Sequence, residues 1–520
     1  MRTSGVLLPV FSLPSPHGIG CFSKEAYEWV DFLKLAGQQY WQILPLGPTS
    51  YGDSPYQSFS TYAGNPYFID LEELVEAGFL TRKEVEACDC GKVARDIDYG
   101  KLYENRMPLL KLAYERSLEK PDPKFTAFWT ENAWWLDDYG LFMAVKDIFG
   151  GNSWDQWAED IRYRWDNAMW YYKTNYSKEI GFYVWLQYLF FTQWQKLKKY
   201  ANDKGLKIIG DIPIYVAYDS ADVWAHPEMF QLDQERKPAA VAGCPPDGFS
   251  ADGQLWGNPL YRWDHHRNTG YDWWVTRISW CFRLYDVVRI DHFRGFDEYF
   301  SIPAKDKTAV NGHWEKGPGI ELFQVIKARL GEKPIIAEDL GGYPNMKVLE
   351  FAFDSRDSSG AGDYLPHNYE HNCVAYTGTH DNETILGWLS SIKPEEVEMV
   401  RAYLNRPTES KQFLASELVR TTIASVADIC IIPIQDYMGL DNSARINFPS
   451  TLGTNWRWRL IKSDLTKALA DSIRKQNIVY GRVKWEDLQE DEKPKDPEEE
   501  KETKTEPKQK EDSSVKEAKD

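Results

Sequence analysis

The sequence predicts an α/β protein built on a (β/α)8, or TIM, barrel that carries inserted, mainly helical subdomains. Short apolar segments recur along the chain, which is typical of parallel strands buried on both faces. Segments with apolar residues at helical spacing lie between them. We find no Gly-rich turn of the dinucleotide-binding type after these strands. Repeated strand–helix alternation without that turn favours a closed barrel.

The N-terminal forty residues predict one strand–helix–strand unit. Val6 to Phe11 is a short strand-like run, and Tyr40 to Leu46 is a second one. Ser23 is a candidate N-cap and Gly37 a plausible end for the helix between them. The helix has apolar residues at helical spacing, namely Ala26, Trp29, Val30 and Leu33.

Two long segments follow before the next predicted strand. Residues 47–70 form a loop rich in Gly, Pro, Ser and Tyr; loops of this length are usually functional or disordered, and its aromatic residues argue against disorder. Residues of about 71–175 predict a helical insertion, clearest at 129–149. An amphipathic helix over 180–200 then leads into the strand-like run at 207–216. We expect residues 1–489 to form one catalytic barrel with these insertions.

Four strand-like segments end in carboxylates. Asp211 follows KIIG, Asp291 follows VVRI, Glu338 follows IIA, and Asp381 follows YTGTH. A single acid at such a place is usually a helix cap or a surface group. Four of them predict an active site, because barrel enzymes place their sites at the C-terminal ends of the strands.

Enzymes that transfer glycosides with retention use a pair of catalytic carboxylates, of which one is the nucleophile and the other the general acid/base. Arg289 and Asp291 are two residues apart on one predicted strand, so both side chains point into the barrel mouth. The guanidinium would keep Asp291 ionised, and a structural ion pair between the two is compatible with this role, because such a pair holds the nucleophile charged and oriented. Asp339 and the apolar residues beside Glu338 would raise the pKa of Glu338, as an acid catalyst requires.

The composition restricts the possible partners. The 61 Lys and Arg against 79 Asp and Glu give a net charge of −18, which argues against nucleic acid and against an anionic membrane. Aromatic residues make up 15% of the chain. They predict either a large aromatic core or a groove of flat faces that stack on sugar rings.

The cysteines and the apolar runs bear on location. Seven scattered cysteines without a CxxC pattern predict neither a disulfide framework nor a zinc site, and they favour a reducing compartment. No apolar run reaches the length of a membrane span, and the N-terminus lacks a convincing signal peptide. We therefore expect a cytoplasmic protein.

The last part of the chain, residues 490–520, changes character. Residues 491–520 hold eight Lys and twelve Asp or Glu, so 8 − 12 = −4, with Val515 as the one sizeable apolar residue. Such a segment cannot bury enough surface to order itself, so we expect a disordered, charged tail. It is either a solvated tail without function or a binding segment whose protein partner the sequence leaves unknown.

Seven long motifs then reveal a resemblance that runs from about Gly5 to about Trp485. They are GDSPYQSFSTYAGNPYFID, GDIPIYVAYDSADVW, PPDGFSADGQLWGNPLYRW, VVRIDHFRGFDEYFSIPA, IIAEDLG, TGTHDNET and NFPSTLGTNWRWR. The chain resembles the 4-alpha-glucanotransferases, also called amylomaltases or disproportionating enzymes, which are relatives of the α-amylase clan. The resemblance implies transfer of α-1,4-glucan segments between maltooligosaccharides or starch- or glycogen-derived glucans, without a cofactor or a metal.

The resemblance also implies roles by position. Asp291 matches the nucleophile, Glu338 the acid/base and Asp381 a third carboxylate that holds substrate hydroxyls. Residues of about 243–265 match a loop over the acceptor side. The positions expected to bind substrate are Arg289, His380, Asp211, Tyr56, Tyr51, Ser54, Gln254, Trp256, Asn258, Arg445 and Asn447.

Two alternatives remain at this point. Hydrolases of the amylase clan usually carry Asn-His shortly after the first of these acids and often Lys-His after the nucleophile; here Asp211 is followed by IPIYV and Asp291 by HFRG. A hydrolase, and the structural calcium common in that clan, are therefore disfavoured. A glucan-binding protein that has lost catalysis is disfavoured because all three carboxylates are present.

Overall fold

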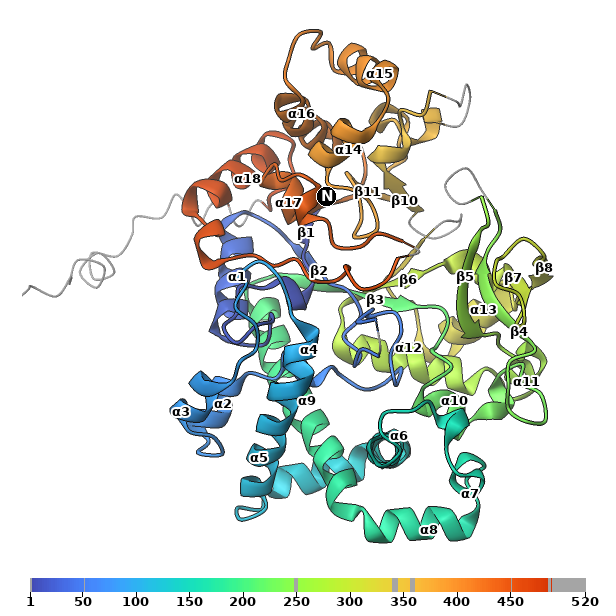
Figure 1. The fold of residues 1–520 in the computed structure, drawn as a ribbon. Coiled ribbons are helices and arrows are strands. Elements are labelled where there is room, and N and C mark those ends of the chain that lie inside the picture. Colours follow the sequence, from blue (N-terminus) through green and yellow to red (C-terminus); the bar gives the residue numbers. More distant parts are fainter. Residues whose placement is uncertain are drawn as a thin grey trace, which may run out of the picture.

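The computed structural model describes residues 2–50, 52–246, 251–338, 345–355, 361–449, 451–484 and 488. Eight parallel strands close into a barrel in the order β1-β12-β11-β10-β9-β6-β3-β2 (Figure 1). The barrel strands are β1 (Thr3–Leu7), β2 (Tyr40–Gln42), β3 (Lys207–Pro213), β6 (Val287–Asp291), β9 (Ile335–Ala337), β10 (Asn345–Val348), β11 (Cys373–Tyr376) and β12 (Ile429–Pro433). The predicted (β/α)8 barrel is confirmed.

The first strand–helix–strand unit forms with shorter strands than the sequence predicts. Helix α1 (Lys24–Leu35) follows Ser23, and Gly37 adopts a φ of 69° just beyond its end. The predicted strand over Val6–Phe11 is wrong in its second half, because Val10 starts a 3₁₀ turn after Pro9. Proline has no N–H to donate to a neighbouring strand, so the strand stops before it.

Eight α-helices of the described residues lie in the connection between β2 and β3. They are α2 (Leu71–Glu76), α3 (Arg82–Ala87), α4 (Tyr99–Lys101), α5 (Met107–Ser117), α6 (Pro123–Ile148), α7 (Glu159–Arg162), α8 (Asp166–Asn175) and α9 (Ser177–Asp203). Helices α6, α7 and α8 lie at the far end of the molecule from β10 and β11 (Figure 1). The ring of Phe128 on α6 packs against those of Tyr188 and Phe191 on α9, at 5.7 and 5.9 Å. Helix α9 thus joins these helices to the barrel.

A small antiparallel sheet, which the sequence analysis missed, stands beside the barrel. Its strands are β4 (Ala240–Cys244), β5 (Gln254–Pro259), β7 (Glu298–Pro303) and β8 (His313–Lys316), in the order β5-β4-β7-β8. Strands β4 and β5 are inserted after barrel strand β3, and β7 and β8 after β6. Because β4 pairs with β7 across about sixty residues of sequence, no local pattern marks the pairing.

The remaining helices follow the barrel strands in chain order. They are α10 (Ala221–Ala225), α11 (Trp263–Asn268), α12 (Asp272–Leu284), α13 (Ile320–Leu330), α14 (Ile385–Ser391), α15 (Pro394–Leu404), α16 (Lys411–Ala424), α17 (Ile434–Tyr437) and α18 (Lys467–Val479). Within the described ranges, none of the helices is both long and apolar enough to cross a bilayer.

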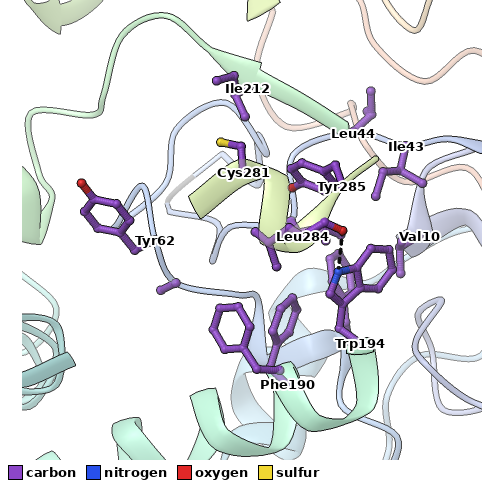
Figure 2. Close-up of a cluster of buried hydrophobic side chains, with 14 of the residues drawn as sticks. Val10, Ile43, Leu44, Tyr62, Phe190, Trp194, Ile212, Cys281, Leu284 and Tyr285 are labelled. Carbon is purple, nitrogen blue, oxygen red and sulfur yellow. Dashed lines mark hydrogen bonds between the residues drawn. The ribbon is translucent and has the colours of Figure 1, made fainter. Parts of the chain in front are cut away.

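Aromatic residues fill much of the core. Figure 2 shows Phe190 and Trp194 of α9 facing Leu284 and Tyr285 at the end of α12, and the indole N–H of Trp194 donates to the Leu284 carbonyl at 3.1 Å. Six tryptophans of the described residues are 0% exposed, namely Trp29, Trp41, Trp154, Trp194, Trp224 and Trp274. The aromatic excess of the sequence therefore serves the core in large part, and burial of these side chains stabilises the layer between helices and barrel.

Candidate active site

Arg289 lies at the centre of a charged cluster in the barrel mouth. Arg289 on β6 is the register partner of Asp211 on the neighbouring strand β3, so the two side chains lie side by side. Arg289 Nη1 lies 2.7 and 2.6 Å from the two carboxylate oxygens of Asp211 and 3.2 Å from Asp291 Oδ1. Arg289 and Asp211 are 1% and 0% exposed, whereas Asp291 is 27% exposed at the surface of the cluster.

Glu338, the residue directly after strand β9, completes the cluster. Arg289 Nη2 lies 2.7 Å from Glu338 Oε1, and the backbone N–H of His292 donates to Glu338 Oε2 at 2.9 Å. His292 adopts a left-handed conformation with a φ of 52°, which turns the chain directly after Asp291. His292 was not among the predicted site residues, although its place next to the predicted nucleophile was a signal for it.

The protonation states differ from those that the sequence predicts. Burial by itself raises the pKa of Glu338, but the charge of Arg289, a hydrogen bond with Asp291 and the N–H of His292 lower that pKa to about 2. Burial and the charge of Glu338 raise the pKa of Asp291 well above its usual range, against the weaker effect of Arg289. The expectation of a protonated Glu338 beside an ionised Asp291 is therefore wrong for the ligand-free protein, because Arg289 lies closer to Glu338. The two carboxyls therefore titrate as a coupled pair, and the surroundings of Glu338 favour its ionised form over that of Asp291.

Tyr56 and His380 form an aromatic wall next to the cluster. The Tyr56 hydroxyl donates to Asp211 Oδ2 at 2.9 Å and lies 2.8 Å from His380 Nε2. The two rings stack with centroids 5.2 Å apart. Trp456, which the sequence analysis missed, lies 5.9 Å from the Tyr56 ring and 6.0 Å from the His380 ring. Its aromatic character in the NFPSTLGTNWRWR motif was the signal for it.

Asp381 is held from the C-terminal part of the chain. Asn447 Nδ2 donates to Asp381 Oδ1 at 2.6 Å, and Arg445 Nη2 donates to the Asp381 carbonyl at 2.7 Å. His380 Nε2 lies 3.4 Å from the same carboxylate oxygen. Asp381 is 41% exposed, so its carboxylate faces the open side of the site. The structure thus brings together four predicted site residues from separate parts of the sequence, namely His380, Asp381, Arg445 and Asn447.

The residues around Trp256 form another wall. The Trp256 ring contacts His292 edge-on at 4.8 Å, and its indole N–H donates to Gln254 Oε1 at 3.1 Å. Asn258 is buried, donates to the Val216 carbonyl at 2.8 Å and accepts a bond from Gln57 at 3.0 Å. The predicted loop over 243–265 is thus partly strand, since β5 spans Gln254–Pro259.

Two expected binding positions lie in the 47–70 segment. Ser54 Oγ accepts a bond from the Tyr56 backbone N–H at 3.3 Å, so Ser54 shapes the turn that presents Tyr56. Tyr51 lies outside the described residues, as do residues 247–250 and the tail from 489 onward.

The groups in the cluster are suited to acid/base and nucleophilic chemistry on a sugar. Two partly exposed carboxyls, Asp291 and Glu338, share one buried guanidinium, and two pairs of aromatic rings, Tyr56 with His380 and Trp256 with His292, belong to residues around them. In the part of the chain that the structure describes, no group of three or more His, Cys, Asp or Glu side chains could hold a metal ion. The fold and the cluster define a carbohydrate-active barrel protein that works with carboxylates.

The comparisons with known proteins identify the family. The sequence matches the 4-alpha-glucanotransferase family, glycoside hydrolase family 77, over residues 8–464. The chain belongs to this family. A 4-alpha-glucanotransferase of Clostridium butyricum is 48% identical, over 91% of this chain and 99% of its own length. One of Thermus thermophilus is 46% identical, over 89% and 96%. The amylomaltase of Streptococcus agalactiae, solved with acarbose, has a TM-score of 0.89 at 42% identity, over 93% of this chain and 100% of its own.

Proposed function

We propose that this chain transfers a segment of an α-1,4-glucan to the 4-hydroxyl of an acceptor glucose or glucan, by a retaining double displacement through a covalent glycosyl-Asp291. Family membership supports the activity, because the curated relatives carry the name 4-alpha-glucanotransferase. The substrates proposed are maltooligosaccharides and starch- or glycogen-derived glucans, in keeping with the acarbose bound to the Streptococcus agalactiae amylomaltase.

The observation that carries the mechanism is that Asp291 and Glu338 meet at one guanidinium. They hydrogen-bond to each other and contact Nη1 and Nη2 of Arg289 at 3.2 and 2.7 Å. Inverting enzymes keep their carboxyls about 6.5–9.5 Å apart to admit a water, whereas retaining enzymes keep them about 5–5.5 Å apart. Two carboxyls that hydrogen-bond to each other leave no room for a water between them, which favours direct attack by a carboxylate.

The proton of the pair must move before the first step. In the ligand-free protein the raised pKa of Asp291 favours the proton there, while Arg289 and the His292 N–H stabilise the Glu338 carboxylate. A sugar that enters between the two carboxyls breaks their hydrogen bond and draws Glu338 toward the glycosidic oxygen. Away from Arg289, Glu338 becomes the more basic group and takes the proton, while Asp291 remains against Arg289 as the carboxylate.

The two steps then use the same residues in opposite senses. Glu338 protonates the glycosidic oxygen while Asp291 attacks the anomeric carbon, and the reducing-end fragment leaves. Glu338 next deprotonates the acceptor 4-hydroxyl, which displaces Asp291 and rebuilds the α-1,4 bond. Asp381, held by Asn447 and Arg445, is placed to bind sugar hydroxyls. Aromatic walls at Tyr56 and Trp256 favour transfer by excluding water.

Incubation of the full chain with maltotriose tests the activity. A transferase yields glucose and a ladder of longer oligosaccharides, whereas a hydrolase yields shorter products alone, and a binding protein yields none. Only the ladder supports the proposal.

Two variants test the covalent mechanism. Asp291→Asn should lower transfer by about 10⁴-fold or more, and the exposed neighbour Asp297→Asn should leave it unchanged. With α-maltosyl fluoride, whose leaving group needs no acid, Glu338→Gln should accumulate a maltosyl adduct on Asp291 that mass spectrometry detects. Near-normal turnover in Asp291→Asn, or an adduct on another residue, would sink the assignment.

A further inference from the structure

Two cysteines outside the glucan site lie in direct contact. Cys88 follows helix α3, Cys90 comes two residues later, and their sulfur atoms are 3.1 Å apart. Both are free thiols, with Cys88 half-buried and Cys90 3% exposed. A small reagent can therefore reach the pair from the side of Cys88, with Cys90 directly beneath it.

The backbone between them is folded in a way that suits a bond. The N–H of Cys90 donates to the carbonyl of Cys88 at 3.0 Å, which closes a three-residue γ-turn centred on Asp89. Asp89 does not have a positive φ, so this is the relaxed inverse γ-turn. Such a turn brings the two Cα atoms within the distance of about 4.4–6.8 Å that disulfides span.

Neighbouring residues hold this turn in place. Lys101 Nζ contacts the Asp89 carboxylate at 2.6 Å, and Asn105 Nδ2 donates to the Asp89 carbonyl at 3.1 Å. The two sulfurs are thus kept together by the backbone and by the following helix, rather than by a chance rotamer. Little conformational entropy remains to be lost when they join.

Charge at the site favours a reactive sulfur. The Cys88 thiol and the buried Arg106 lower the pKa of Cys90 to about 7, against the effect of burial. Arg106 is 0% exposed, and its Nε has no hydrogen-bond partner among the described residues. A thiolate is the nucleophile in thiol oxidation, and a nearby guanidinium stabilises it.

We propose that Cys88 and Cys90 form a redox-modification site at which a small peroxide converts the dithiol reversibly into a disulfide. The Cys90 thiolate attacks one peroxide oxygen and becomes a sulfenic acid as the other oxygen leaves as hydroxide. The Cys88 thiol then gives its proton to that hydroxide, attacks the Cys90 sulfur and displaces the second hydroxide. With the two thiol protons counted, one peroxide and two thiols give one disulfide and two waters. A dithiol reductant reverses the change by exchange.

Another pair of cysteines in the same chain provides an internal control. Cys373 on β11 and Cys430 on β12 lie on adjacent barrel strands and are both buried, and burial raises the pKa of each to about 11. These two lack both the thiolate and the access of Cys88 and Cys90. We expect them to stay reduced under conditions that oxidise the proposed site.

The experiment treats the reduced full chain with graded hydrogen peroxide, blocks remaining thiols with iodoacetamide and analyses the peptides by mass spectrometry. In the peptide that holds Cys88 and Cys90, alkylation of both cysteines should disappear at least tenfold faster than alkylation of Cys373. Treatment with dithiothreitol should restore it. Two results would overturn the proposal. One is that the Cys88–Cys90 pair and Cys373 lose alkylation at equal rates. The other is that Cys88 and Cys90 stay fully alkylated at a peroxide dose that oxidises glutathione added as a reference thiol.

Two variants and a gel distinguish the intended bond from other oxidation. In Cys88→Ser and in Cys90→Ser, the remaining thiol should form a sulfenic acid that dimedone traps, and no internal disulfide. A non-reducing gel of the oxidised wild-type chain should show a monomer. A disulfide-linked dimer at the same peroxide dose would mean that Cys88 pairs between chains, and would contradict the proposal even if the variants fail to fold.

Discussion

Arg289 engages both carboxylate oxygens of Asp211, at 2.7 and 2.6 Å, more closely than it engages the proposed nucleophile Asp291 at 3.2 Å. Asp211 is fully buried, and its burial raises its pKa against the effect of Arg289. A single guanidinium thus faces three carboxyls. The charge of Asp211 therefore helps to decide how the proton is shared between Asp291 and Glu338.

Replacement of Asp211 by Asn should shift the pH dependence of transfer. The substitution removes a buried negative charge, so it lowers the pKa of both remaining carboxyls, and the bell-shaped profile of kcat should move to lower pH by about one unit. Rates measured from pH 3 to 9 with maltotriose test this, with Asp297→Asn as the control. A profile that keeps its position or moves to higher pH would contradict the shared-charge interpretation.

Replacement of Asn447 by Ala should release the Asp381 carboxylate. Asn447 Nδ2 donates to Asp381 at 2.6 Å, and a hydrogen bond to a charged group contributes about 1.5–3 kcal/mol. We expect kcat/KM for maltotriose to fall about tenfold or more. The exposed residue Asn167 on α8 supplies the matched control, Asn167→Ala. Equal activity of the two variants would show that Asp381 needs no such support.

Removal of the Tyr99 hydroxyl should weaken the wall that holds Trp456. Tyr99 Oη donates to the Trp456 carbonyl at 2.8 Å, and Trp456 packs on Tyr56 and His380. Tyr99→Phe should lower the free energy of unfolding by about 1 kcal/mol and raise the KM for glucan with little change in kcat. Urea unfolding and steady-state kinetics measure the two effects. Tyr103→Phe, at a residue 66% exposed, should change neither.

Stability in mild acid should depend on His266. Burial lowers the pKa of His266 to about 4, and its Nε2 lies 3.2 Å from the Met229 carbonyl. The folded protein therefore keeps His266 neutral where the unfolded chain, with a pKa of about 6.5, binds a proton. This contribution is full above pH 6.5 and is lost as the pH falls toward 4, by about 3 kcal/mol at most.

Variants must be compared with the wild type, because other groups also make the unfolding free energy depend on pH. Carboxyls whose pKa is raised by folding make it rise as the pH falls, which is opposite to the effect of His266. His266→Gln should flatten the fall of unfolding free energy between pH 6.5 and 4, while His313→Gln, whose side chain is 66% exposed, should leave it as in the wild type. Parallel curves for wild type and His266→Gln would contradict the assignment of this slope to His266.

Part of the site could be predicted because strand direction is visible in sequence. Asp291 is the last residue of β6 and Glu338 follows β9 directly, as the apolar runs indicate. Asp211 instead lies within β3, which continues to Pro213. Trp456 and His292 were missed because ring contacts between distant segments and a left-handed turn have no periodic signal.

The sequence by itself determined the barrel, the family and the four carboxylates, because apolar periodicity and long motifs are local properties of the chain. Only the tertiary structure decided that Arg289 lies closer to Asp211 and Glu338 than to Asp291, that these surroundings raise the pKa of Asp291 and lower that of Glu338, and that Cys88 and Cys90 are in contact. Each of these depends on distances of a few Å between groups, and electrostatic energy in a buried site changes steeply over such distances.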